Sequence, residues 1–151
     1  MKRDISLDGY WRLAAYEVGL GERQGAHRAH YDTSGWLDAS VPGSIRSHLL
    51  EAGLVSETLT GKEWWYRTEF TLLPGFPLEH SLLVFDRLPS ATVWVNGTKL
   101  PSDDSCSYDV RSLLKLGPNT IAIRFDADPG FDGLFLGSAH IVARKVSSVG
   151  C

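Results

Sequence analysis

The stretch KEWWYRTEF, residues 62–70, combines a high density of aromatic rings with alternation between apolar and polar side chains. Successive side chains of a β-strand point to opposite faces of the sheet, so this period of two predicts a half-buried strand. The core-facing set is Trp64, Tyr66, Thr68, Phe70 and Leu72. The intervening set, which contains Trp65 and Arg67, is then expected to face away from the core.

Other segments carry the same signal at intervals along the chain. Further strands are expected over residues 9–17, 81–88, 91–100, 119–127 and 139–146. Within 91–100, the pair Asn96-Gly97 stands between two β-rich flanks. This pair predicts a tight two-residue hairpin, because both residues tolerate the positive φ angles that such turns require.

Helix signals are scarce. A short helix is expected over 44–53, with Ser44 as its N-cap and Gly53 as its stop, and one or two helical turns over 110–115. Many short strands separated by turn residues are typical of β-sandwiches and jelly rolls. The sequence therefore predicts an all-β, jelly-roll β-sandwich with one or two short helices, formed by a single domain over residues 1–151.

Composition is that of a globular protein. Hydrophobic residues make up 43% of the 151 residues and charged residues 22%. The formal net charge is −3 and Lys and Arg form no run, so we expect no nucleic-acid partner. No apolar segment approaches the roughly 20 residues that span a bilayer, and no signal-peptide pattern is visible. We therefore expect a cytoplasmic protein without a membrane partner, or a domain expressed without its signal.

Cysteine and histidine give no support for a metal or disulfide site. Cys106 and Cys151 are the only cysteines, which favours two reduced thiols over a bridge between them. His27 and His30 are three residues apart, but a zinc site needs at least three protein ligands and no third is apparent. We interpret them as residues of a solvated loop and expect no bound cofactor.

Seven segments, in order along the chain, resemble one known domain. They are LDGYWRL, YDTSGWLDASVPGSIRSHLLEAGL, KEWWYRTEF, LLVFDRL, ATVWVNG, YDVRSLLKLGPNTIAIRF and GLFLGSAHIVA. Together they resemble the N-terminal sugar-binding jelly roll of glycoside hydrolase family two, in the β-mannosidase, β-galactosidase and exo-glucosaminidase group. The resemblance covers nearly the whole chain and implies a galactose-binding-domain-like sandwich.

The resemblance also bears on catalysis. In that family the jelly roll precedes an immunoglobulin-like domain and a (β/α)₈ barrel, and the barrel holds both catalytic glutamates. A barrel of this kind needs about 200–250 residues, which a chain of 151 residues cannot supply beside a sandwich. The resemblance therefore implies that this chain has no catalytic residue and is not an enzyme.

The remaining chemistry is carbohydrate binding. The C–H face of a pyranose packs on an exposed aromatic ring, while its hydroxyls bond to acidic, amide or Arg side chains. The candidate ligand-binding residues are Trp36, Trp65, Arg67, Trp94, Asp126, Asp128 and Asp132. The three aspartates fall in the region from which family members extend an acidic residue toward the sugar.

Each candidate also has a purely structural interpretation. Asp126, Asp128 and Asp132 stand among glycine and proline residues, which favours turns; a structural Ca²⁺ bound to their oxygens is a weaker alternative. The tryptophans can be covered by neighbouring strands or by the helix expected over 45–52. An exposed Trp65 beside Arg67 would also suit a protein interface.

Three functions follow, in order of preference. The first is a non-catalytic carbohydrate-binding or accessory domain for β-linked sugars. The second is a fragment or split subunit that packs against a glycosidase catalytic domain or self-associates, without independent sugar binding. The third, an enzyme acting through the 126–132 acids, is the least favoured.

Overall fold

The computed structural model describes residues 5–51, 53, 62–86, 88, 91–101, 107–125 and 135–143. The strands are β1 (Ile5–Ser6), β2 (Gly9–Glu17), β3 (Leu37–Val41), β4 (Gly43–Ser44), β5 (Lys62–Leu72), β6 (Ser81–Phe85), β7 (Ala91–Val95), β8 (Thr98–Lys99), β9 (Ser107–Asp109), β10 (Gly117–Phe125), β11 (Phe135–Leu136) and β12 (Ala139–Ala143). The helices are α1 (Leu20–Gln24), α2 (Ile45–Glu51) and the 3-10 turn η1 (Leu78–His80).

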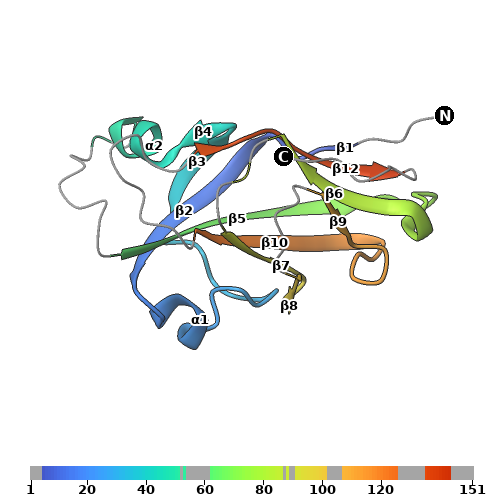
Figure 1. Ribbon diagram of the computed structural model, residues 1–151, viewed down its shortest axis with the longest axis horizontal. Coiled ribbons are helices and arrows are strands. Elements are labelled where there is room, and N and C mark those ends of the chain that lie inside the picture. Colours follow the sequence, from blue (N-terminus) through green and yellow to red (C-terminus); the bar gives the residue numbers. More distant parts are fainter. Residues whose placement is uncertain are drawn as a thin grey trace.

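Two antiparallel sheets form the body of the molecule. One is six-stranded, in the order β3-β2-β5-β10-β7-β8, and the other is four-stranded, in the order β1-β12-β6-β9. A two-stranded pair, β11 with β4, lies beside α2 (Figure 1). Figure 1 shows β12 and β6 in one layer above β5 and β10, so the predicted all-β sandwich is confirmed.

The main core lies between these layers and is apolar. Trp11, Tyr66, Leu83, Ile121 and Ile141 are each fully buried there. Since burial of a large apolar side chain contributes about 1.5–3 kcal/mol, this cluster is the principal stabilising feature of the sandwich.

The alternation predicted for residues 64–72 is confirmed on the inner face of β5. Trp64, Tyr66 and Leu72 belong to the core between the sheets. The register of the β5–β10 pair places Trp64 opposite Phe125 and Leu72 opposite Gly117. The inner face of β5 therefore contributes to the core at Trp64, Tyr66 and Leu72, with Phe70 packed partly buried against it.

The predicted hairpin and helix are also present. Asn96 and Gly97 have φ angles of 51° and 85°, as a tight turn between β7 and β8 requires. At the start of α2, the Ser47 N–H donates to Oγ of Ser44 over 3.1 Å, so Ser44 caps the helix as expected. The predicted turn at 110–115 is a short hydrogen-bonded turn in which the Leu114 N–H donates to the carbonyl of Val110.

Several elements differ from the sequence-based expectations. The strand expected over 81–88 ends at Phe85, and α1 and the short strands β1, β3, β4, β9 and β11 were not predicted. Pieces of two to five residues carry too little periodicity to stand out in a sequence. In the part of the chain that the structure describes, no helix is long and apolar enough to cross a membrane.

Candidate functional site

A long connection between β2 and β3 covers the outer face of the six-stranded sheet. We call residues 18–36 the strap; it contains α1 and is bounded by Glu17 and Leu37. Figure 1 shows α1 below the sheet, on the side opposite β12 and β6. Connections longer than about 12–15 residues are uncommon in compact domains and are often functional, which makes the strap the first place to look for a site.

The strap closes a second, smaller buried cluster. Trp65 of β5 and Trp94 of β7 stack with their centroids 4.9 Å apart and an interplanar angle of 17°. Ala26 of the strap and Ala122 of β10 complete the cluster. Trp65 is therefore fully buried, although it points away from the main core.

Glu63 anchors the first part of the strap. Its carboxylate accepts hydrogen bonds from the Gly19 N–H at 2.7 Å, from the Gly21 N–H at 3.2 Å and from Nε1 of Trp65 at 2.7 Å. A Cβ atom at Gly21 would lie 2.6 Å from Cε2 of Trp65, so only glycine fits at this contact. Farther along α1, Glu22 pairs with Arg124 of β10 at 3.0 Å.

Arg67 anchors the middle of the strap. Its Nη1 donates to the carbonyls of Ala26 and Arg28, and its Nη2 donates to the carbonyl of Ala29 at 2.8 Å. The side chain is 2% exposed, and its burial lowers the pKa of the guanidinium. Backbone carbonyls thus replace the water that a buried cation loses, while Nε has no hydrogen-bond partner among the described residues.

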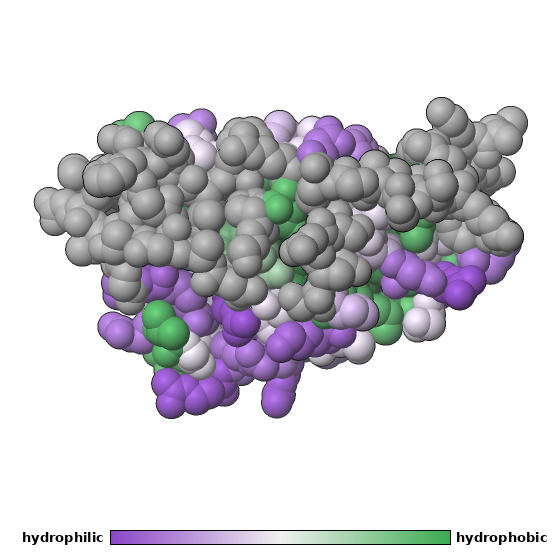
Figure 2. Space-filling view, in the orientation of Figure 1, coloured by the Kyte–Doolittle hydropathy of each residue, from purple (hydrophilic) through white to green (hydrophobic). Residues whose placement is uncertain are grey.

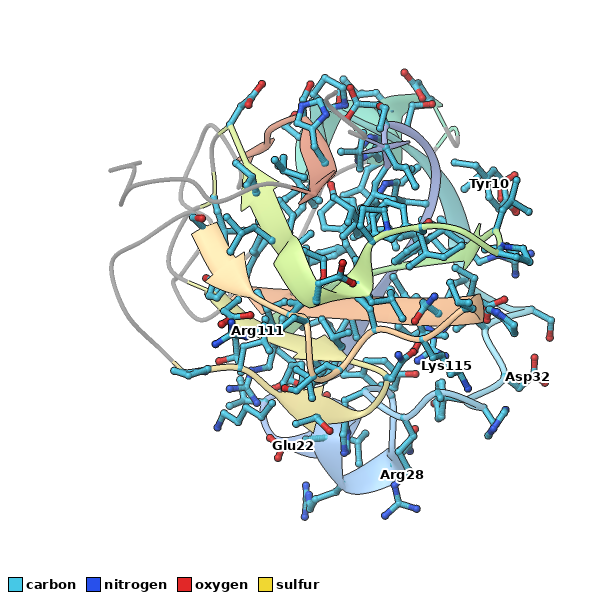
Figure 3. All side chains as sticks on the ribbon, turned by 90° about the vertical axis from the view of Figure 1, so that its right-hand side faces the viewer. Tyr10, Glu22, Arg28, Asp32, Arg111 and Lys115 are labelled. Atoms are coloured by element: carbon cyan, nitrogen blue, oxygen red, sulfur yellow. The ribbon has the colours of Figure 1, made fainter. Side chains whose placement is uncertain are left out.

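A pocket of about 490 Å³ opens where the end of the strap leaves the sheet. It is lined by Tyr10, Arg12, Tyr31, Asp32, Thr33, Ser34, Arg67, Thr68 and Glu69. Figure 3 shows Tyr10 and Asp32 at the same edge of the domain. The volume is in the range of small-molecule sites, about 300–1,000 Å³, and the lining is mainly polar.

The sheet side of the pocket comes from β2 and β5. Tyr10 and Arg12 alternate with the buried Trp11 and therefore point to the outer face. The Tyr10 hydroxyl donates to Oδ1 of Asp38 at 2.9 Å, and Cζ of Arg12 lies 5.7 Å from the Tyr10 ring centroid. Arg12 is opposite Arg67 in the strand pairing. Two guanidinium groups thus stand on adjacent strands at this edge.

The strap side of the pocket is held by polar contacts. Nη1 of Arg12 donates to the carbonyl of Thr33 at 2.6 Å, which fixes the strap to β2. The Tyr31 hydroxyl lies 2.7 Å from that of Tyr16. Oδ1 of Asp32 accepts a hydrogen bond from the Ser34 N–H at 2.9 Å, and this bond lowers the pKa of the Asp32 carboxyl. Asp32 is therefore an anion at neutral pH.

The carboxylates of this pocket do not suit acid catalysis. A glycosidase acid must stay protonated at its working pH, which requires a partly apolar environment. The Asp32 pKa is lowered, not raised, and the Glu69 side chain is 65% exposed to water. Groups in this state accept hydrogen bonds from a polar ligand, and that is the chemistry the pocket supports.

The structure places the predicted site residues in different environments. Arg67 lines the pocket. Trp65 and Trp94 lie within the smaller buried cluster beneath the strap, and Trp36 is half-buried and packs against that cluster. The cover over these rings is the strap, whereas the sequence suggested neighbouring strands or the 45–52 helix. Asp126, Asp128 and Asp132 lie outside the described residues, as do Cys106 and Cys151.

Of the nine pocket residues, sequence reasoning identified only Arg67; the eight that it missed include the charged or exposed residues Tyr10, Arg12, Asp32 and Glu69. Three of these four lie on the outer-facing positions of strands, where a tyrosine, an arginine or a glutamate is unremarkable. The available signal was the long polar interval between two strands. In the strap, the His27 ring packs against Trp94 at 5.4 Å, and no group of three metal-ligating side chains occurs among the described residues.

The comparisons with known proteins agree with this architecture. The family model described as glycosyl hydrolase 2 galactose-binding domain-like matches residues 22–132. An exo-beta-D-glucosaminidase from Amycolatopsis orientalis is 26% identical over 123 residues, which cover 68% of this chain and 12% of that protein. This chain therefore spans about one-eighth of the length of the curated relative.

Solved structures show the same fold. A beta-glucuronidase from Lactobacillus rhamnosus aligns with a TM-score of 0.71 at 20% identity, covering 95% of this chain and 29% of that one. A Ruminococcus gnavus beta-glucuronidase aligns with a TM-score of 0.71 at 18% identity and the same coverage. The resemblance expected from the sequence is confirmed: this chain belongs to the glycosyl hydrolase 2 galactose-binding domain-like family.

Proposed function

We propose that this chain is a non-catalytic carbohydrate-binding domain of the glycoside hydrolase family two type, with β-linked sugars as its ligands. The observation that carries this proposal is the polar pocket between the strap and the outer face of the sheet. The proteins that this chain resembles include an exo-beta-D-glucosaminidase and a beta-glucuronidase. A shallow domain site of this kind serves to hold a sugar unit, while bond cleavage belongs to another part of such enzymes.

The chemistry of the pocket supports binding without cleavage. Asp32 is held ionised by its hydrogen bond from Ser34, and Glu69 is largely in water. Neither is placed to protonate a leaving group. The hydroxyls, guanidinium groups and carboxylates that line the pocket are the groups that bond to sugar hydroxyls.

Calorimetric titration with methyl β-glycosides and β-linked disaccharides tests the proposal. Saturable binding is expected with a Kd on the order of 1 mM, which corresponds to about −4 kcal/mol. The same samples are to be incubated with nitrophenyl β-glycosides, and no release of nitrophenol is expected. Absence of binding at tens of millimolar sugar, or turnover above a heat-denatured control, would refute the proposal.

A second function is favoured by a separate observation. The chain spans 12% of the curated relative and about 29% of the structural neighbours, which supports packing against a catalytic domain. Leu73 and Leu116 are 71% and 45% exposed, and the pairing of Leu72 with Gly117 places them at the same end of the sheet. We propose this end as the docking surface.

Size-exclusion chromatography with a separately expressed catalytic portion of a family-two glycosidase tests the docking proposal. Co-elution is expected, and the Leu73→Asp variant is expected to abolish it. Val18→Asp serves as the charge-matched control, because Val18 is 72% exposed and follows Glu17, which pairs with Lys62 at the opposite end of β5. If the two chains elute separately at tens of micromolar, packing of this kind does not occur.

A further inference from the structure

The cationic groups at the pocket are already engaged by the protein. Arg67 is 2% exposed and donates to three strap carbonyls. Arg12 donates through Nη1 to Thr33, and the Tyr10 hydroxyl donates to Asp38. The Arg67 guanidinium, Nη1 of Arg12 and the Tyr10 hydroxyl are thus directed at the backbone or at a neighbouring side chain.

The acceptors, by contrast, have capacity left for a ligand. A carboxylate offers about four lone-pair sites, and Asp32 uses only part of this capacity, in its hydrogen bonds with the N–H and the side chain of Ser34. Oε1 of Glu69 lies 3.9 Å from Nη2 of Arg67, beyond hydrogen-bond distance, and its side chain is 65% exposed. The oxygens of these two carboxylates are therefore able to accept hydrogen bonds from the hydroxyl groups of a ligand.

The charges at the pocket favour one class of sugar over another. The carboxylates of Asp32 and Glu69 line the pocket, and Asp38 lies beside the Tyr10 hydroxyl. The two cations are directed elsewhere: Arg67 is buried beneath the strap, and Arg12 donates to the Thr33 carbonyl and lies over the Tyr10 ring. A ligand carboxylate would lose hydration and meet like charges, which is unfavourable. A neutral sugar meets carboxylates that accept hydrogen bonds from its hydroxyls, and an aromatic ring at Tyr10, which is 63% exposed.

We infer that the pocket selects an uncharged hexopyranose unit and discriminates against a sugar that carries a carboxylate. Glu69 and Asp32 accept hydrogen bonds from the sugar hydroxyls, and the C–H face of the ring packs on Tyr10. This inference rests on the proposed carbohydrate-binding function and adds to it the binding residues and the charge class of the ligand.

A matched ligand pair tests the inference. Methyl β-D-glucopyranoside and methyl β-D-glucopyranosiduronic acid differ only in the oxidation of C6, so the pair isolates the effect of one carboxylate. In a chemical-shift titration at pH 7 and low ionic strength, we expect the neutral glycoside to bind at least tenfold more tightly than the glucuronide. The discrimination should shrink at high salt, because screening reduces repulsion between exposed charges.

Two variants assign the effect to the pocket. Glu69→Gln keeps the size of the side chain and removes its charge, and it is expected to weaken the neutral glycoside severalfold and to reduce the preference over the glucuronide. Glu17→Gln alters another exposed glutamate of the same sheet, which pairs with Lys62, and it is expected to leave both affinities unchanged. Retained dispersion of the amide spectrum shows that each variant is folded.

The outcomes separate the inference from the function on which it rests. If neither sugar binds, the carbohydrate-binding proposal fails and the inference fails with it. If both sugars bind equally, or if Glu69→Gln leaves the preference intact, the inference is wrong while carbohydrate binding stands.

Discussion

The two faces of β5 are both buried, but by different means. The inner face packs Trp64, Tyr66 and Leu72 against another sheet. The outer face packs Trp65 under the strap and holds it there with Arg67, whose donors bond to strap carbonyls. The inner cluster is maintained by apolar burial, which is not directional, and the outer cluster by specific polar contacts. We therefore expect the inner face to determine stability and the outer face to determine function.

Around the strap the surface is polar, as expected for a cover that faces water. Figure 2 shows mostly hydrophilic residues over the lower part of the molecule, where Figure 1 places α1 and β8. The strap therefore conceals the stacked rings of Trp65 and Trp94 beneath a solvated exterior.

The largest effect is expected from truncation within the inner core. Trp11→Ala removes a fully buried ring and the hydrogen bond from its Nε1 to the Leu7 carbonyl at 2.6 Å. Removal of a buried Trp side chain costs about 3–5 kcal/mol, so the free energy of unfolding from urea titration should fall by that amount. A loss below about 1 kcal/mol would mean that the core between the sheets is not the principal stabilising feature.

A smaller but more local effect is expected from Arg67→Met. This variant keeps apolar length but leaves the carbonyls of Ala26, Arg28 and Ala29 without their donor. Hydrogen bonds to charged groups are each worth about 1.5–3 kcal/mol, and partial access of water reduces the sum, so we expect a loss of about 2–3 kcal/mol.

Hydrogen exchange distinguishes this local effect from a global one. Amides of residues 21–31 should exchange much faster in Arg67→Met, while those of β6 and β12 on the far side of the core change only with global stability. Uniform acceleration throughout the chain would contradict the division into two clusters.

Gly21→Ala tests the close packing of the strap on Trp65. A Cβ at this position meets the indole ring and the Glu63 carboxylate, and overpacking of this kind costs about 1–3 kcal/mol. Gly35→Ala is the matched control, because a Cβ there has no neighbour within 4 Å, and thermal unfolding should be nearly unchanged. Equal midpoints for the two variants would show that the strap does not pack on Trp65.

The smallest effect is expected at Tyr16. Its burial, followed by its contact with Tyr31, raises its pKa from 10.0 to about 12. The neutral form is thus favoured in the folded state, and its contribution is complete below pH 10 and is lost as pH rises from 10 to 12. Tyr16→Phe should cost about 1 kcal/mol at pH 7 and make stability fall less steeply above pH 10, as measured by urea unfolding across that range.

Much of the fold is predictable from the sequence because it depends on local pattern. The alternation at residues 64–72, the Asn96-Gly97 turn and the Ser44 cap are short-range signals, and each is confirmed. The burial of Trp65 is not local, because it depends on residues some forty positions earlier in the chain. A period of two shows which face a side chain occupies but not what covers that face.

The candidate site was less accessible to sequence reasoning for the same reason. Arg67 was identified because an arginine stands beside tryptophans in a strand. Tyr10, Asp32 and Glu69 come together only when the end of the strap is placed across β2 and β5. These residues belong to separate segments, so no sequence pattern within one segment predicts that they are neighbours.

A residue-resolved titration with methyl β-D-glucopyranoside tests the central claim most directly, namely that the pocket under the strap binds sugar. We predict saturable amide shifts confined to residues 9–13, 31–34 and 67–69, which form the pocket and its immediate strands. Shifts that fail to saturate, or that centre on residues remote from this edge such as β6 and β12, would contradict the account.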